Sequence, residues 1–427
     1  MFNYRLWFIG AFLSNIGTWM QHTAQDWLIF NELSHNDSTR LGIVMSLQFG
    51  PQLFLAPYAG VLADRLDRRK LLYMTQSAMG VLSLILGFLV MSGHIQIWHV
   101  YALALVAGII VSLEVPARQT FVSELVHDND LPNAVALNST SFNSARLIGP
   151  ACAGILVVLL GTGPVFFINA ATFLIMLAAI SLIRTRELRP TPRADRSTGR
   201  IRDGVAYVRK RPDILAVMVA VFLVGTFGIN SAMNIAAMAT TEFDKGAGEF
   251  GFLNSTMAVG SVIGTLLAAR RERPRLRFIF GASAAFGLSA LCAALSPNLL
   301  FFSITLIPMG LCALTIITSA NAYVQVTTEP QMRGRVMSLY IAVFLGGTPI
   351  GAPLVGLVND HWGARWGLGI AALSGVLAGC IGLLWYYRSE KLKLVFDRSR
   401  KTKFVFKRAV EEPLDPVTTA LEIQQPR

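Results

Sequence analysis

Long apolar runs separated by short polar segments fill most of the chain. Each run has about 20 residues or more, which is the length that a helix needs to cross a hydrocarbon core of about 30 Å. The runs are too long and too continuous for the alternating strands of a membrane barrel. The sequence therefore predicts an all-α polytopic membrane protein with twelve transmembrane helices, at 6–31, 41–63, 71–92, 97–119, 133–159, 164–184, 213–239, 248–269, 276–296, 299–324, 335–358 and 365–387.

Composition supports this prediction. The 427 residues are 53% hydrophobic and only 15% charged, whereas soluble proteins use about 25% charged residues, so a soluble enzyme is excluded. The net charge of +12 alone is compatible with a nucleic-acid partner, but the charges fall between the apolar runs, so we expect none. The four cysteines lie within apolar runs without metal-ligand spacing, and we expect no metal and no cofactor.

Lysine and arginine placement predicts the orientation. With a cytoplasmic amino terminus, 33 of the 37 basic residues lie on the inner side, three on the outer side, and Arg146 within a span. Because basic residues are enriched in cytoplasmic loops, both termini are expected inside, in a bacterial cytoplasmic membrane. The expected domains are a six-helix bundle at 1–184, a linker at 185–212, a second six-helix bundle at 213–387 and a basic cytoplasmic tail at 388–427.

The linker and the tail contain the longest polar segments. Residues 199–211 are basic with apolar positions at helical spacing, which predicts an amphipathic helix on anionic lipids of the inner leaflet, with a solvated linker as the alternative. In the tail, residues 391–396 and 402–407 alternate between polar and apolar, as in a basic hairpin or a surface-bound segment.

The two halves of the chain repeat each other. The sequence Gly60-Val-Leu-Ala after the second run matches Gly264-Thr-Leu-Leu after the eighth, and Ile148-Gly149 in the fifth run matches Ile350-Gly351 in the eleventh. The similar offsets indicate two pseudo-symmetric six-helix bundles. Such repeats are typical of secondary transporters, whose substrate site lies between the halves.

The most specific motif follows the second span. It reads Gly60-Val-Leu-Ala-Asp64-Arg65-Leu-Asp-Arg68-Arg69-Lys and resembles the loop signature of the major facilitator superfamily. The resemblance extends over about residues 1–390 and implies the twelve-helix fold of that family. It also implies that Asp64 and the arginines stabilise one conformation of two bundles that rock against each other.

A second set of motifs narrows the resemblance. Pro116-Ala-Arg118-Gln119 and the segment from Asp130 to Pro150 are similar to the branch of that superfamily that contains the enterobactin exporter and related drug efflux proteins. Gly149, Pro150 and Gly154 partly match the antiporter signature of the fifth helix. A Gly-Pro pair bends or loosens a span; an ordinary packed kink is an equal alternative.

Ionisable residues within spans are functional candidates because burying a charge is costly. Glu114 in the fourth span and Arg146 in the fifth are close enough in depth to pair, either for proton coupling or as a static ion pair. Asp26 lies near the outer end of the first span and is a weaker proton-coupling candidate. Family resemblance makes the first, fourth, seventh and tenth spans central, so we expect the substrate cavity to be lined by Trp19, Gln25, Phe227, Asn230, Asn234, Thr318 and Asn321.

These features favour a secondary transporter that exports a small amphiphilic molecule such as a drug, dye or siderophore. The chain has no phosphate-binding loop for ATP, so the proton gradient is the expected energy source. The alternatives are an importer with the same fold and a sensor or scaffold that does not transport. No motif of a hydrolase or metalloprotease is present, so we expect no enzymatic activity and no catalytic residues. We expect a monomer whose partners are the substrate, protons and inner-leaflet lipids.

Overall fold

The structure is a computed structural model of the chain. It describes residues 2–189, 201–228, 230–270, 274–389, 392–396 and 404–408. Within these ranges, side chains are described except at 56, 57, 59–65, 128, 201, 202, 269, 386–389 and in the two strands.

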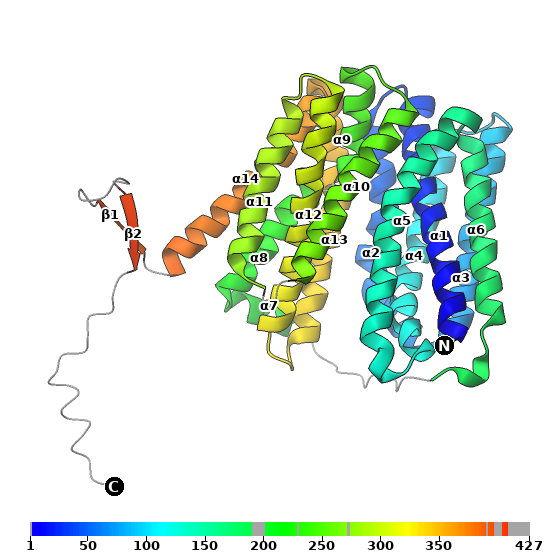
Figure 1. Ribbon diagram of the computed structural model, residues 1–427, viewed down its shortest axis with the longest axis horizontal. Coiled ribbons are helices and arrows are strands. Elements are labelled where there is room, and N and C mark those ends of the chain that lie inside the picture. The colour runs from blue at the N-terminus through cyan, green and yellow to red at the C-terminus, as the bar shows by residue number, and fades with distance from the viewer. Residues whose placement is uncertain are drawn as a thin grey trace, which may run out of the picture.

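The first half is a bundle of six long helices (Figure 1). The first helix ends in a π-helical turn, η1, and short 3₁₀ turns, η2 and η3, precede α5 and follow α6. Their bounds are α1 Phe2–Trp27, η1 Leu28–Leu33, α2 Ser38–Arg65, α3 Arg68–Met91, α4 Ile97–Leu125, η2 Asp128–Asp130, α5 Leu131–Leu160, α6 Thr162–Leu182 and η3 Thr185–Glu187.

The second half repeats this architecture, but its first span is built from four pieces. Two helices and two π-helical turns follow each other between Pro212 and Glu242, with Ile229 outside the described residues. The bounds are α7 Ile201–Arg209, α8 Pro212–Leu223, η4 Val224–Gly228, α9 Ser231–Ala237, η5 Met238–Glu242, α10 Ala247–Ala269, α11 Leu276–Ala294, α12 Leu299–Thr327, α13 Arg333–Trp362 and α14 Ala364–Ser389.

A helix is found at each of the twelve expected positions, and the all-α, two-bundle fold is confirmed. Ten of the described helices are long and apolar enough to cross a membrane. The two long helices that are less apolar than the others are α1 and α2. Helix α1 contains polar residues such as Asn3, Asn15 and Gln25, which lower its hydropathy. These residues are buried, so α1 still packs in the core of the first bundle.

The linker and tail segments also have structure. Helix α7 spans Ile201–Arg209 and agrees with the expected linker helix. In the tail, β1 Leu392–Phe396 pairs with β2 Phe404–Arg408 in an antiparallel hairpin that is set apart from the bundles (Figure 1). The hairpin alternative is therefore the one observed. The remaining tail, like most of the segment before α7, lies outside the described residues.

Glycines allow helices of the same bundle to approach closely. A Cβ at Gly260 of α10 would lie 1.9 Å from the carbonyl oxygen of Ile307 on α12, and one at Gly287 of α11 would lie 2.6 Å from the backbone nitrogen of Val376 on α14. Small residues at such crossings are a common way to pack helices in lipid, where hydrophobic burial between helices contributes little. The second bundle is thus held by direct backbone contacts.

The two bundles meet through α2 with α13 and α5 with α10. Gly42 lies against the backbone of Ala352, and Gly154 lies against Gly251. The ring of Trp27 also contacts that of Phe250, with centroids 5.8 Å apart. These contacts lie at the end of the molecule that is opposite the N-terminus of the chain. The two bundles therefore close on each other at that end.

Candidate functional site

A buried polar network surrounds Glu114 in the first bundle. Its Oε1 accepts a hydrogen bond of 2.8 Å from Gln76 Nε2 of α3 and lies 3.2 Å from Arg118 Nε, one turn further along α4. Arg118 Nη1 in turn donates to Asn15 Oδ1 of α1 at 2.9 Å. Only 8% of the Glu114 surface is exposed. The network thus joins a carboxylate to three helices and gives its charge a compensating cation.

The expected pairing of Glu114 with Arg146 is not observed. Glu114 pairs with Arg118 instead, because residues four apart on a helix lie on the same face. Arg146 lies on α5, where its guanidinium carbon is 5.4 Å from the ring centroid of Trp19 on α1. The sequence spacing of Glu114 and Arg118 could have indicated this pair; the contributions of Gln76 and Asn15 could not be read from it.

Asp26 lies on the same face of α1 as Trp19 and His22, since these positions are separated by three and four residues. His22 Nδ1 is 3.1 Å from Gln48 Nε2 of α2, and the Trp19 and His22 rings have centroids 5.9 Å apart. Within the described part of the chain, Asp26 makes no hydrogen bond or ion pair. The structure therefore does not bring Asp26 and Glu114 together.

A second polar site joins the two bundles at their closed end. The carboxylate of Asp360, in the last turn of α13, accepts hydrogen bonds from the backbone nitrogens of Ser38 at 2.7 Å and Thr39 at 2.9 Å, and from the Thr39 hydroxyl. These nitrogens belong to the first turn of α2, where the helix dipole favours an anion. We call this contact the Asp360 clasp; no sequence pattern indicated it.

Asp360→Ala is expected to loosen the closed end. Loss of a capping carboxylate costs about 1 kcal/mol, and less where it is exposed, which shifts a two-state equilibrium by up to about fivefold. Spin labels at positions 40 and 361, in a variant without the four native cysteines, would measure this shift as a larger population of long distances. Glu249→Ala removes a carboxylate from the first turn of α10 within a single bundle and should leave the distances unchanged; equal behaviour of both variants would contradict the clasp.

The loop signature is only partly described. The side chains of Asp64 and Arg65 and the surroundings of Gly60 fall outside the described set, so the role implied for Asp64 stays a prediction. Arg68 contacts Glu124 of α4 at 2.5 Å. Arg69 donates to the backbone oxygens of residues 180 and 181 at 3.0 and 2.9 Å, at the carboxyl end of α6. A cation is favourable at that end of a helix, so these arginines fasten the start of α3 to two neighbours.

The Gly-Pro segment of α5 provides close helix contacts. Helix α5 continues through Pro150 from Leu131 to Leu160. A Cβ at Gly149 would be 2.5 Å from that of Trp19, and one at Gly154 would be 3.0 Å from the Cα of Gly251 on α10. Gly149 therefore packs within the bundle and Gly154 packs across the two bundles; an antiporter role for them stays a prediction.

Most of the other cavity candidates are buried or hydrogen-bonded within the protein. Asn230 donates to the carbonyl of Thr226 at 2.8 Å, and the Asn234 oxygen accepts from Asn359 at 3.1 Å. Both asparagines are buried. The remaining candidates are Gln25, which is buried, Phe227, which packs against the core, and Thr318 and Asn321, which bond within α12. Trp19, beside Arg146, is the candidate whose surroundings carry charge.

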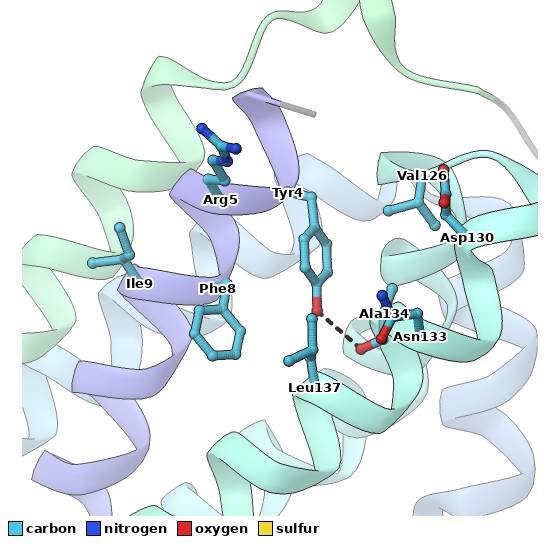
Figure 2. Close-up of a pocket in the computed structure, with 9 residues that line it drawn as sticks. All are labelled: Tyr4, Arg5, Phe8, Ile9, Val126, Asp130, Asn133, Ala134 and Leu137. Carbon is cyan, nitrogen blue, oxygen red and sulfur yellow. Dashed lines mark hydrogen bonds between the residues drawn. The ribbon is translucent and has the colours of Figure 1, made fainter.

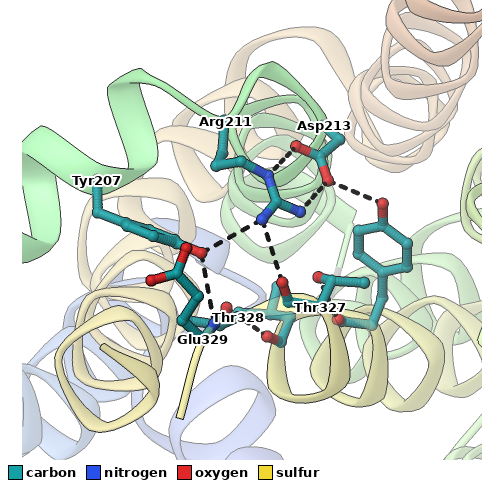
Figure 3. Close-up of polar contacts among 8 residues, drawn as sticks. Tyr207, Arg211, Asp213, Thr327, Thr328 and Glu329 are labelled. Carbon is teal, nitrogen blue, oxygen red and sulfur yellow. Dashed lines mark hydrogen bonds and ion pairs between the residues drawn. The ribbon is translucent and has the colours of Figure 1, made fainter. Parts of the chain in front are cut away.

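The linker helix is fastened to the second bundle. Arg211 and Asp213 form a bidentate pair at 2.9 and 2.8 Å (Figure 3). The Asp213 carboxylate also accepts a hydrogen bond of 2.9 Å from the Tyr323 hydroxyl of α12. Hydrogen bonding to Asp213 raises the pKa of Arg211 above its usual value. Arg211 reaches Tyr207 of α7 at 3.3 Å as well, so α7 and the second bundle are linked on this side.

A cleft opens between α1 and α5 near the N-terminus. It has a volume of about 350 Å³ and mostly apolar walls. Figure 2 shows Tyr4 reaching from α1 to the carbonyl oxygen of Ala134 on α5, at 2.9 Å. The lining residues on α1 end at Ile9, well before Trp19. The cleft is therefore separate from the polar sites described above.

Two six-helix bundles, a closed contact at one end and charged groups between buried helices define a transporter of the major facilitator type. The chain belongs to the family described as transmembrane secretion effectors, whose sequence profile matches residues 2–422. It is a multi-pass membrane transporter of small molecules and not an enzyme.

Known relatives support the same assignment. The staphyloferrin A transporter of Staphylococcus aureus is 24% identical over 92% of this chain and 98% of its own length. The macrolide efflux protein A of Streptococcus pyogenes is 24% identical over 83% and 88%. The enterobactin exporter EntS of Shigella flexneri is 25% identical over 76% and 78%. The resemblance to the exporter branch is thus confirmed.

Solved structures show the same fold. A bacterial homologue of the human lysosomal transporter Spinster, in an inward-facing conformation, superposes with a TM-score of 0.70 over 90% of this chain and 96% of its own, at 12% identity. The nucleoside transporter NupG superposes with a TM-score of 0.71 over 90% and 100%, at 14% identity.

Proposed function

We propose that this protein exports a small amphiphilic molecule across a bacterial cytoplasmic membrane in exchange for protons. The observation that carries the proposal is the similarity to exporters of enterobactin and macrolides, which extends over 76% and 83% of this chain. Relatives with such different substrates favour a shared export mechanism over a shared ligand.

Both termini are proposed to be cytoplasmic, on the strength of the basic residues on the inner side. In that orientation the end closed by the Asp360 clasp faces outward. The molecule described above is then in an inward-facing conformation, ready to take substrate from the cytoplasm.

The orientation has a direct test. A reporter enzyme that is active only outside the cytoplasm should be silent when fused after Arg196 and active when fused within 242–248, because these segments flank opposite ends of the seventh span. Activity would be measured in whole cells with matched expression. The reverse pattern would contradict the orientation and, with it, the assignment of the clasp to the outer side.

Glu114 is proposed as the proton carrier. In an inward-facing conformation an antiporter has released its proton to the cytoplasm, so its carrier should be charged and compensated; Glu114 beside Arg118 fits this state. In the outward-facing conformation, a proton from outside would neutralise Glu114 and free Arg118 from the pair. The network would thus differ between the two states, as coupling requires.

Transport would be measured in inside-out vesicles without ATP. Amphiphilic dyes, macrolides and siderophores would be tested for accumulation after a pH gradient, acid inside, is imposed. We expect at least one of these classes to accumulate in vesicles that contain the protein, and a protonophore to prevent it. Accumulation that survives the protonophore would overturn proton coupling, and gradient-driven accumulation only in right-side-out vesicles would favour an importer.

A further inference from the structure

Arg146 is a cation within a transmembrane helix, and its guanidinium has no anionic partner among the described residues. It is partly buried on α5, and its guanidinium lies over the ring of Trp19. Among the described residues, no carboxylate or hydrogen-bond acceptor contacts its nitrogens. By contrast, Arg68 and Arg118 are each paired with a carboxylate of α4. A cation in this position is costly without a compensating anion, and the ring of Trp19 compensates its charge only in part.

A second aromatic ring lies beside Trp19. Trp19 lies edge-on to Phe142 of α5, with ring centroids 5.8 Å apart, and Phe142 is 46% exposed. A guanidinium recognises a carboxylate or similar anion through two parallel hydrogen bonds. The exposed ring of Phe142, next to Trp19, favours stacking or edge contacts with a planar ring.

We propose that Arg146, Trp19 and Phe142 form the part of the substrate site that binds the acidic group of an aromatic anion. This inference rests on the proposed transport function and specifies its substrate class. The acidic group of the substrate binds at the guanidinium of Arg146, and its ring lies beside Trp19 and Phe142.

Binding can be measured without transport. The full-length protein in lipid nanodiscs would be titrated with 2-naphthoate, 2-naphthamide and 2-naphthylmethylamine, which share one ring system and differ in charge. We expect naphthoate to bind about tenfold more tightly than the other two, the size of one charge-assisted hydrogen-bonded pair. Arg146→Gln should abolish this preference, and Arg146→Lys should keep only part of it because lysine lacks the bidentate geometry.

Two further variants separate the contributions. Phe142→Leu should weaken naphthoate and naphthamide equally, since it removes a ring contact and no charge. Arg365→Gln removes an arginine that pairs with Glu242 in the second bundle and should preserve the naphthoate preference. Equal binding of the three probes by the wild type, absence of naphthoate binding, or a full preference in a folded Arg146→Gln variant would overturn the proposal. A failure of proton-driven transport would leave these binding results unchanged.

Discussion

Glu114→Gln is expected to reduce pH-gradient-driven accumulation to the level of vesicles without the protein. Glutamine keeps the volume of the side chain and its hydrogen bond with Gln76, but it cannot carry a proton or compensate Arg118. The measurement is the initial rate of substrate accumulation in inside-out vesicles, with and without an imposed gradient. Substrate binding to the variant in nanodiscs should persist, because the change affects coupling.

Glu124→Gln is the matched control, since it makes the same chemical change on the same helix. Glu124 pairs with Arg68 near the end of α4, so its neutralisation is expected to leave the accumulation dependent on the gradient, even if the rate changes. Gradient-driven accumulation at the wild-type rate in Glu114→Gln would assign Glu114 a structural role, as a static ion pair with Arg118.

Gly356→Val is expected to stop transport by holding the closed end apart. A Cβ at this position would lie 2.7 Å from the carbonyl oxygen of Ser38 and from the Cα of Thr39, and backbone atoms cannot move aside without separating α13 from α2. Each bundle should still fold, because this contact lies between bundles. Spin labels at positions 40 and 361 should then report long distances in nearly the whole population.

Gly260→Val is expected to prevent folding, whereas Gly356→Val is expected to leave the bundles folded. A Cβ at Gly260 would lie 1.9 Å from the backbone of α12 within the second bundle, and overpacking of a well-packed core costs about 1–3 kcal/mol or more. We expect a loss of folded protein in the membrane, measured as monodisperse yield and thermal stability. If Gly356→Val lost folded protein to the same extent, the distinction between contacts within and between bundles would be wrong.

The spans were predictable because apolar length depends on bilayer thickness and on little else. The break in the seventh span was not predictable in this way. The π-helical turn η4 includes Thr226, whose carbonyl oxygen would be 1.8 Å from a Cβ at Gly351 of α13. The irregular backbone thus coincides with a close approach of two helices that are distant in sequence, and no local pattern encodes such an approach.

The charged residues of the candidate site were predictable, but their partners were not. A charge in an apolar run identified Glu114 and Arg146, because such charges are costly and rare in membranes. Their partners depend on helix rotation and on neighbours from other helices, which is why Glu114 pairs with Arg118 and not with Arg146, and why Gln76 was missed. Asp360 was missed for a different reason: it lies at the end of a span, where an acidic residue is ordinary.

The Asp360 clasp has a consequence for how related sequences should be compared. Two of its three donors are main-chain nitrogens of Ser38 and Thr39, and every amino acid except proline supplies such a donor. Substitutions at those two positions therefore require no matching change at Asp360. Residue covariation between the two halves of related chains would therefore detect the packing of α2 against α13 but not the clasp. The clasp would have to be identified from the acidic residue at the position of Asp360 alone.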